Sequence, residues 1–107
     1  MKQEFESSSQ LTKQFAEFYK LFKKEFSKML RETFDVTEIQ MSRGHFCAYG
    51  FFQIVDGSIW YFSLGDVRWG VHQLLVRTAK SFNDYMGGSN SFIEVDDVEG
   101  LKRIVSR

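Results

Sequence analysis

The spacing of apolar positions divides the chain into a helical first third and a strand-rich remainder. Between about Ser8 and about Phe34, large apolar residues recur at steps of three or four, which is the period of a helix with one buried face. This face consists of Leu11, Phe15, Phe18, Phe22, Phe26 and Met29. The opposite side carries Lys13, Lys20, Lys24 and Arg31. The pattern predicts a long amphipathic helix, and Ser7 with Gln10 predicts a capping box at its start.

After this helix the period changes to that of a strand. The segment from Val36 to Ser42 alternates weakly, and the apolar side would show Thr37, Ile39 and Met41. Weak alternation of this kind is typical of a strand near the edge of a sheet. Arg43-Gly44 then predicts a turn that leads into the next strand.

Two apolar runs, Phe46 to Val55 and Ser58 to Leu64, flank Asp56-Gly57. An Asp-Gly pair between such runs is the strongest short-range signal of a β-hairpin, because a two-residue turn of this type needs positive φ at both central residues. The sequence therefore predicts a central hairpin with a two-residue turn.

The two-residue turn would give the hairpin two apolar faces. It would place Gln53 opposite Trp60 and Phe52 opposite Tyr61. One face then shows Phe52, Ile54, Ile59 and Tyr61, and the other shows Tyr49, Phe51, Val55, Trp60, Phe62 and Leu64. A sheet face open to water normally carries polar residues, so each face needs a cover. The long helix covers one face, and the C-terminal segment, a second subunit or a ligand must cover the other. The sequence therefore predicts a homo-oligomer, with a dimer favoured.

The last third of the chain predicts two more strands and a short helix. The expected segments are a loop at Gly65 to Gly70, a strand at Val71 to Ala79, a polar, turn-rich stretch at Lys80 to Ser91 and a strand at Phe92 to Val95. Asp96 with Glu99 fits a capping box that begins an amphipathic helix. The element order predicts an α+β fold. A long N-terminal helix packs on an antiparallel sheet of about five strands with a central Asp-Gly hairpin, and a short C-terminal helix follows.

Length and composition indicate one domain over residues 1–107, with residues 1–8 expected to be disordered. The formal net charge is 0, which argues against a general polyanion binder. Cys47 is the single cysteine, which excludes an intrachain disulfide and favours a cytoplasmic setting. Met1 to Gln10 lacks the apolar stretch of a signal peptide, and no run approaches the roughly twenty apolar residues of a membrane span.

The motifs of common enzymes and cofactor sites are absent from the sequence. His45 and Cys47 lie two residues apart and His72 is distant, which is an incomplete set of metal ligands. No nucleophile elbow, Walker motif or dinucleotide-binding spacing occurs. Asp96 and Asp97 are interpreted as helix caps rather than as paired acids. We therefore expect a non-enzymatic binding protein without a metal or another cofactor.

The most unusual stretch is Gly87-Gly88-Ser89-Asn90. Adjacent glycines let backbone N–H groups turn to one side and form a small anion-binding nest, although a plain loop between two strands is the simpler interpretation. Arginine supplies a fork for phosphate or carboxylate, and tryptophan or tyrosine supplies a stacking surface. The predicted site comprises Arg68, Trp69, Arg77, Lys80, Asp84, Tyr85, Gly87, Gly88, Ser89 and Asn90. Its predicted ligand is a phosphate-bearing small molecule or a host protein.

Besides an enzyme whose catalytic groups converge only in the folded chain and leave no trace in the sequence, two alternative functions remain open at this point. A nucleic-acid-binding module would use Lys13, Lys20, Lys24 and Arg31, together with exposed aromatic side chains, to follow a phosphate backbone. Glu17 interrupts this basic stripe, and a charged helix face is otherwise a solvated one. The other alternative is a structural homo-oligomer without a ligand, which predicts a large apolar interface.

Three short segments resemble one protein family. They are Gly65-Asp66-Val67-Arg68, Leu75-Val76-Arg77-Thr78-Ala79-Lys80 and Asp84-Tyr85-Met86-Gly87-Gly88-Ser89-Asn90. They are similar to segments of short proteins encoded by bacterial phages and conjugative elements, although Met86 stands where that pattern has a small polar residue. The resemblance implies a mobile-element origin and a binding protein of the host-interaction or anti-defence kind. It implies no particular activity.

Overall fold

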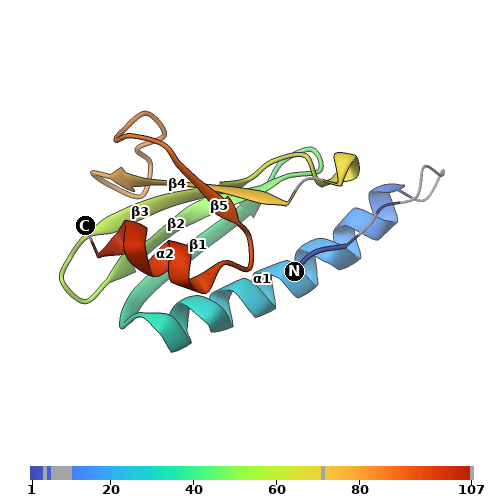
Figure 1. Cartoon of the computed structure of the whole chain (residues 1–107). Helices are drawn as coiled ribbons and strands as arrows, with labels where there is room; N and C mark the ends of the chain where they lie inside the picture. Colours follow the sequence, from blue (N-terminus) through green and yellow to red (C-terminus); the bar gives the residue numbers. More distant parts are fainter. Residues whose placement is uncertain (4, 6–10, 71, 107) are drawn as a thin grey trace.

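The computed structural model describes residues 1–3, 5, 11–70 and 72–106, and it shows helices packed on a five-stranded sheet (Figure 1). The elements in chain order are α1 (Leu11–Thr33), β1 (Val36–Arg43), β2 (Ala48–Ile54), β3 (Ile59–Leu64), the short 3-10 helix η1 (Val67–Trp69), β4 (Gln73–Ala79), β5 (Ser91–Glu94) and α2 (Val98–Val105). The predicted α+β class is confirmed. The predicted capping box of Ser7 and Gln10 lies outside the described residues. Within these ranges no helix is both long enough and apolar enough to cross a membrane.

The five strands form one antiparallel meander, in which the order in the sheet follows the order in the chain. The helices α1 and α2 lie on the same side of this sheet (Figure 1). We call this side the helix face. The opposite side, which neither α1 nor α2 covers, is called the helix-free face.

The main core lies between the two helices and the helix face. From α1 it receives Phe15, Phe18, Phe22, Phe26 and Leu30. The Phe26 ring lies 4.9 Å from the Phe62 ring of β3, and α2 adds Leu101 and Ile104. The predicted apolar face of α1 is confirmed, although Met29 at its end is only partly buried. Stability therefore depends chiefly on this layer.

The central hairpin is confirmed, but its predicted register is wrong by one residue. Phe52 pairs with Trp60 rather than with Tyr61. Gly57 has a φ of 90°, and its N–H donates to the Ile54 carbonyl oxygen at 2.9 Å. A turn followed by one left-handed glycine forms a three-residue loop with a bulge, whereas the predicted two-residue turn needs two residues with positive φ. The extra loop residue shifts the pairing.

The corrected register changes which side chains share a face. The helix-free face carries Tyr49, Phe51, Tyr61, Ser63, Leu75, Arg77 and Phe92. Phe51 is only 2% exposed, because the loop between β4 and β5 places the rings of Phe82 and Tyr85 at 5.9 and 5.2 Å from its ring. The cover of this face is a segment of the same chain that we had not predicted. The reason for expecting a second subunit is therefore weaker.

The described part of the first eight residues packs against the domain, although we predicted disorder for residues 1–8. The Gln3 backbone N–H donates to His72 Nε2 at 3.2 Å, and the Phe5 ring lies 5.4 Å from the Phe18 ring. These contacts explain the difference for residues 1–3 and 5, because a polar segment gains order when it is tied to a folded sheet and helix.

The start of α2 agrees with the prediction of a cap at Asp97 but not with the predicted capping box of Asp96 and Glu99. Asp97, rather than Asp96, is the N-cap, and its carboxylate accepts the Gly100 N–H at 2.9 Å. Gly100 therefore occupies the third helical position, where a capping box needs the side chain of Glu99. Asp96 instead lies 3.3 Å from the ammonium group of Lys2.

Candidate functional site

Strand β4 separates the predicted site residues into two groups. Arg68 lies in η1 before β4, and the loop at residues 80–90 follows it. The seven residues of β4 extend over about 23 Å at about 3.3 Å per residue. Figure 1 shows η1 and this loop at opposite ends of the sheet. The prediction that Arg68 lines the same site as Arg77 is therefore wrong, and the side chain of Trp69 lies outside the described part of the chain.

Arg68 has a carboxylate partner of its own. Its guanidinium lies over the Phe46 ring, 4.3 Å from the centroid, and its Nε lies 3.0 and 3.1 Å from the two carboxylate oxygens of Asp66. The hydrogen bond from Arg68 holds the pKa of the Asp66 carboxyl below its ordinary value. This pair stabilises the loop between β3 and β4, and its guanidinium is not left for an external anion.

Arg77, Tyr85 and Asn90 do come together, on the helix-free face. The Arg77 guanidinium lies over the Tyr61 ring at 4.5 Å from the centroid. It donates to the Tyr85 carbonyl oxygen, and to Asn90 Oδ1 at 3.4 Å. The Tyr85 ring in turn lies 5.8 Å from the Tyr61 ring. These contacts attach the loop at residues 80–90 to β3 and β4.

Asp84 binds two backbone N–H groups of the loop in which the anion nest was predicted. Its Oδ2 accepts the Lys80 N–H at 2.9 Å, and its Oδ1 accepts the Met86 N–H at 3.1 Å. These bonds, first that from Lys80 and then that from Met86, lower the pKa of Asp84. Gly87 lies so close to the same carboxylate that a side chain there would collide with it. The loop is thus folded around an anion of its own chain, in the place where we predicted an external phosphate.

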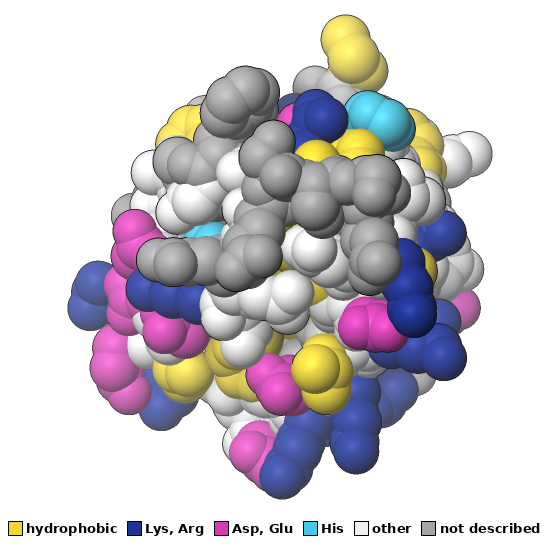
Figure 2. Space-filling model, turned by 90° about the vertical axis from the view of Figure 1, so that its right-hand side faces the viewer, with side chains coloured by type: hydrophobic (Ala, Val, Ile, Leu, Met, Phe, Trp, Pro, Cys, Tyr) yellow, Lys and Arg dark blue, Asp and Glu magenta, His cyan; other side chains and the backbone are white. Residues whose placement is uncertain are grey.

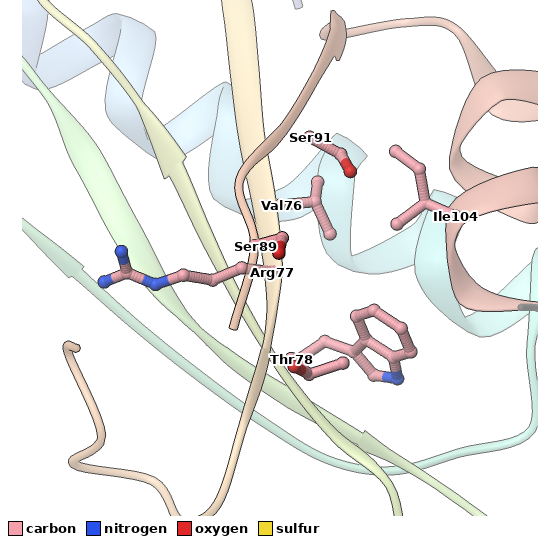
Figure 3. A pocket seen from close by; sticks show the side chains of 7 residues that line it. Val76, Arg77, Thr78, Ser89, Ser91 and Ile104 are labelled. Atoms are coloured by element: carbon pink, nitrogen blue, oxygen red, sulfur yellow. The ribbon is translucent and has the colours of Figure 1, made fainter. Parts of the chain in front are cut away.

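Gly88 and Ser89 belong to a different surface. Gly88 has a φ of 66°, and a Cβ there would come within 2.9 Å of the Thr78 carbonyl oxygen. Ser89 lines a shallow pocket of about 250 Å³ on the helix side of β4 (Figure 3). The residues that line it are Trp60, Val76, Arg77, Thr78, Ser89, Ser91 and Ile104. Figure 3 shows the Arg77 side chain pointing away from this pocket. Without a cation that points inward, the pocket is poorly suited to a phosphate.

The basic stripe of α1 consists of Lys13, Lys20, Lys24 and Arg31, which are all exposed. None of the four forms an ion pair within the described ranges. At about 1.5 Å per residue the stripe is about 27 Å long. Figure 2 shows Lys and Arg side chains gathered toward the lower right, with some Asp and Glu among them. The helix-free face, which carries the aromatic side chains, lies on the side of the sheet opposite α1. The basic and the aromatic parts of the predicted nucleic-acid module are therefore separated.

His45 and His72 contact neighbouring residues of the fold, and Cys47 is a free, partly buried cysteine. The His45 ring lies 4.5 Å from the Phe46 ring, and His72 is buried with its Nε2 accepting a backbone hydrogen bond. Over residues 1–3, 5, 11–70 and 72–106, no group of three or more His, Cys, Asp or Glu side chains could hold a metal ion. None of these three residues is part of the candidate site.

Sequence reasoning missed several side chains that dominate the helix-free face. Tyr49 and Tyr61 are partly buried there, and Phe92 is 56% exposed. Strand alternation already placed Tyr49 on the face of Phe51, and the correct register would have placed Tyr61 there as well. No local signal shows that Phe82 folds back over the sheet, because this contact depends on the path of a whole loop.

Comparisons of the chain with protein-family models, with curated proteins and with solved structures found no match. The function is therefore argued from the two surfaces described above. One is the helix-free face with the loop at residues 80–90, which is rich in aromatic side chains. The other is the basic stripe of α1.

Proposed function

We propose that this protein is a non-enzymatic binding protein that recognises a partner protein through the helix-free face and the loop at residues 80–90. The observation that carries the proposal is the exposure of three large apolar side chains there. Tyr85 is 49% exposed, Met86 is 90% exposed and Phe92 is 56% exposed. Large apolar side chains gathered on one surface mark interaction sites, whereas scattered ones are common on any protein.

The residue types on this surface fit a protein interface. Tyrosine, phenylalanine, methionine and arginine are enriched at the centres of interfaces, and lysine and glutamate are depleted. Acidic and basic groups around the face nearly balance one another: Glu38, Asp66, Asp84, Glu94 and Asp96 against Lys2, Arg68, Arg77 and Lys80. A balanced surface has no general attraction for a polyphosphate chain. These features favour a protein partner over a nucleic acid on this face.

Two further observations favour a partner protein over the other expected occupants. The backbone N–H groups of Lys80 and Met86 are bound by Asp84, which argues against a phosphate in the glycine loop. Phe51 is shielded by its own chain, which lowers the need for a second copy. The resemblance of residues 65–68, 75–80 and 84–90 to small mobile-element proteins favours a host protein as the partner.

The proposal is tested with short random peptides selected on the immobilised full-length protein and then measured in solution by fluorescence anisotropy. We expect the selected peptides to lose most of their affinity for Phe92→Ser and for Met86→Ser. The matched control is Leu21→Ser, because Leu21 is 54% exposed but lies on α1. Sedimentation of the wild-type protein alone reports whether it is a monomer.

The outcomes separate the candidate functions. Loss of affinity in Phe92→Ser and Met86→Ser but not in Leu21→Ser supports the proposal. Equal affinity for all variants, or no enrichment of any peptide, contradicts it. A dimer that Phe92→Ser dissociates would assign this face to a second copy of the chain, as in the alternative of a structural homo-oligomer.

The basic stripe carries a second candidate function, which is non-specific binding of nucleic acid through phosphate contacts. Its support is the alignment of Lys13, Lys20, Lys24 and Arg31 on one line of α1 without ion-pair partners in the described part of the chain. Binding of a duplex oligonucleotide should then weaken steeply as salt is raised, and Lys20→Glu should reduce this salt dependence. Absent or salt-independent binding would remove this candidate.

A further inference from the structure

In the described ranges three arginines lie over aromatic rings, and only Arg68 has a carboxylate partner. Arg43 lies 5.8 Å from the ring centroids of Phe15 and Tyr19 and is exposed to water, whereas Arg77 is half-buried. The Arg68 guanidinium lies over Phe46 and is paired with Asp66. The Arg77 guanidinium lies over Tyr61 in the same manner, but its two acceptors are neutral oxygens. In the described ranges no carboxylate lies within ion-pair distance of Arg77, and its buried Nε has no hydrogen-bond partner.

A half-buried guanidinium without a counter-ion has lost part of its hydration, and no opposite charge replaces it. Moving a charge out of water costs free energy unless an opposite charge replaces the lost hydration. Arg68 shows what completes such an arrangement here, namely a planar carboxylate that accepts the guanidinium N–H groups. We propose, as a step that rests on the protein-binding function above, that the partner supplies the corresponding carboxylate to Arg77 from an Asp or Glu side chain.

A hollow lies on the same face next to Leu75, on the η1 side of Arg77 along β4, and accommodates the residue that accompanies this carboxylate. It has a volume of about 230 Å³ and is lined by Ser63, Gly65, Asp66, Gln73, Leu75 and Phe92. Leu75 precedes Arg77 by two residues on β4, so both side chains are on the same face, about 7 Å apart along the strand. Sites for whole small molecules are typically about 300–1,000 Å³, so the hollow suits one side chain. Leu75 and Phe92 select an apolar one. The partner segment therefore has an acidic residue beside a large apolar residue.

The surroundings of Arg77 favour a carboxylate over a phosphate. A phosphate monoester carries about −1.5 to −2 charges and is held best by several cations. Beside Arg77, the carboxylate of Asp84 already occupies the loop backbone, and further along β4 Asp66 borders the hollow. One unpaired guanidinium matches the single charge of one carboxylate.

The test is an NMR titration of the full-length 15N-labelled protein with three pools of short peptides. In the first pool every peptide has Asp or Glu beside Leu or Phe. In the second pool Asn or Gln replaces the acid, and in the third pool phosphoserine replaces it. We expect the acidic pool to shift the Arg77 Nε–H resonance and the amides of Leu75 and Phe92. Its apparent affinity should exceed that of the amide pool by about ten-fold or more, since a hydrogen bond to a charged group contributes at least that factor.

Two variants distinguish the charge of Arg77 from the planar geometry of its guanidinium. Arg77→Gln should abolish the preference for the acidic pool. Arg77→Lys should retain part of it, because lysine keeps the charge but lacks the planar fork. Arg103→Gln, on the exposed side of α2, is the matched control and should leave the affinity unchanged. Spectra of α1 and β2 in each variant show whether the fold is kept.

The outcomes distinguish this inference from the proposed function. Equal affinity for the acidic and amide pools, or wild-type affinity in Arg77→Gln, overturns the role of Arg77, even if shifts at Leu75 and Phe92 still support a protein-binding face. Tighter binding of the phosphoserine pool through Arg77 also overturns it, in favour of a phosphate. If no pool shifts the helix-free face, the proposed function is contradicted as well.

Discussion

The two faces of the sheet are both apolar, but they are covered in different ways. On the helix face, Phe52 and Phe62 are completely buried under packed helices. On the helix-free face, Phe51 is also buried, but the Tyr85 that covers it remains 49% exposed. The first cover has regular backbone hydrogen bonds within each helix, whereas the second is an irregular loop.

The difference lies in what holds each cover in place. A helix satisfies its own backbone groups, so α1 needs only apolar contacts to stay on the sheet. The loop at residues 80–90 depends in addition on side-chain hydrogen bonds, from Arg77 and to Asp84. Segments with few buried contacts and exposed hydrogen bonds open more readily than packed helices do. The helix face therefore supports stability, and the helix-free face is the one suited to recognition.

The largest expected effect is that of Phe62→Ala on the helix face. Phe62 is fully buried and its ring lies 4.9 Å from Phe26. We expect the free energy of unfolding to fall by about 3–5 kcal/mol, because the helix and the sheet cannot both close on the cavity. Urea denaturation measures this loss, and Leu21→Ala on the exposed side of α1 is the control, with little change expected.

Phe51→Ala should cost less than Phe62→Ala, although Phe51 is buried to nearly the same degree. Phe82 and Tyr85 belong to a loop, so they can move into part of the space that the ring leaves. We expect a loss at or below the lower end of the range for such substitutions, about 3 kcal/mol. A loss in urea denaturation that equals or exceeds that of Phe62→Ala would show that the two covers are equally rigid.

Gly88→Ala compared with Gly57→Ala tests how closely the loop lies on β4. Both glycines have positive φ, which costs another residue about 1–2 kcal/mol. A Cβ at Gly57 meets nothing within 4 Å, whereas one at Gly88 comes within 2.9 Å of the Thr78 carbonyl oxygen. We therefore expect Gly88→Ala to cost about 1 kcal/mol more than Gly57→Ala in thermal unfolding. Equal losses would mean that the loop moves away freely.

The smallest effect is a local response of the loop to acid. The pKa of Asp84 is lowered in the folded protein by the N–H groups of Lys80 and Met86. A lowered folded pKa stabilises the loop at pH values above the unfolded pKa of about 3.9, and this contribution is lost as the pH falls through the folded pKa. NMR signals of the Met86 amide and the Tyr85 ring should report the loosening. In Asp84→Asn the same NMR signals should not change over this pH range. Local signals are needed, since the pKa values of Asp56 and Asp66 are lowered too.

Most of the fold could be predicted because helical and strand periods are local properties of the sequence. The spacing of phenylalanines predicted α1, and alternation with turn residues predicted the strands. The hairpin register could not be predicted, because it depends on whether Asp56 adopts positive φ together with Gly57. The same two residues allow either loop.

The candidate site could be predicted only where its members are close in the chain. Arg77, Tyr85 and Asn90 meet because they flank or belong to one loop. Arg68 was assigned to the same site by its nearness in sequence, but the length of β4 separates them. The role of Asp84 depends on how the loop backbone folds around its carboxylate, and residue type alone does not show this.

The helix α1 is synthesised before the sheet on which it packs. Each strand pairs with the strand made immediately before it, so hairpins form while the chain is still growing. α1 precedes every one of those strands, yet Phe22 and Phe26 are buried only after β3 and β4 have been made. The nascent chain therefore displays a row of phenylalanines to water for most of its elongation. During that interval, chaperone binding and aggregation between nascent chains set the yield of folded protein.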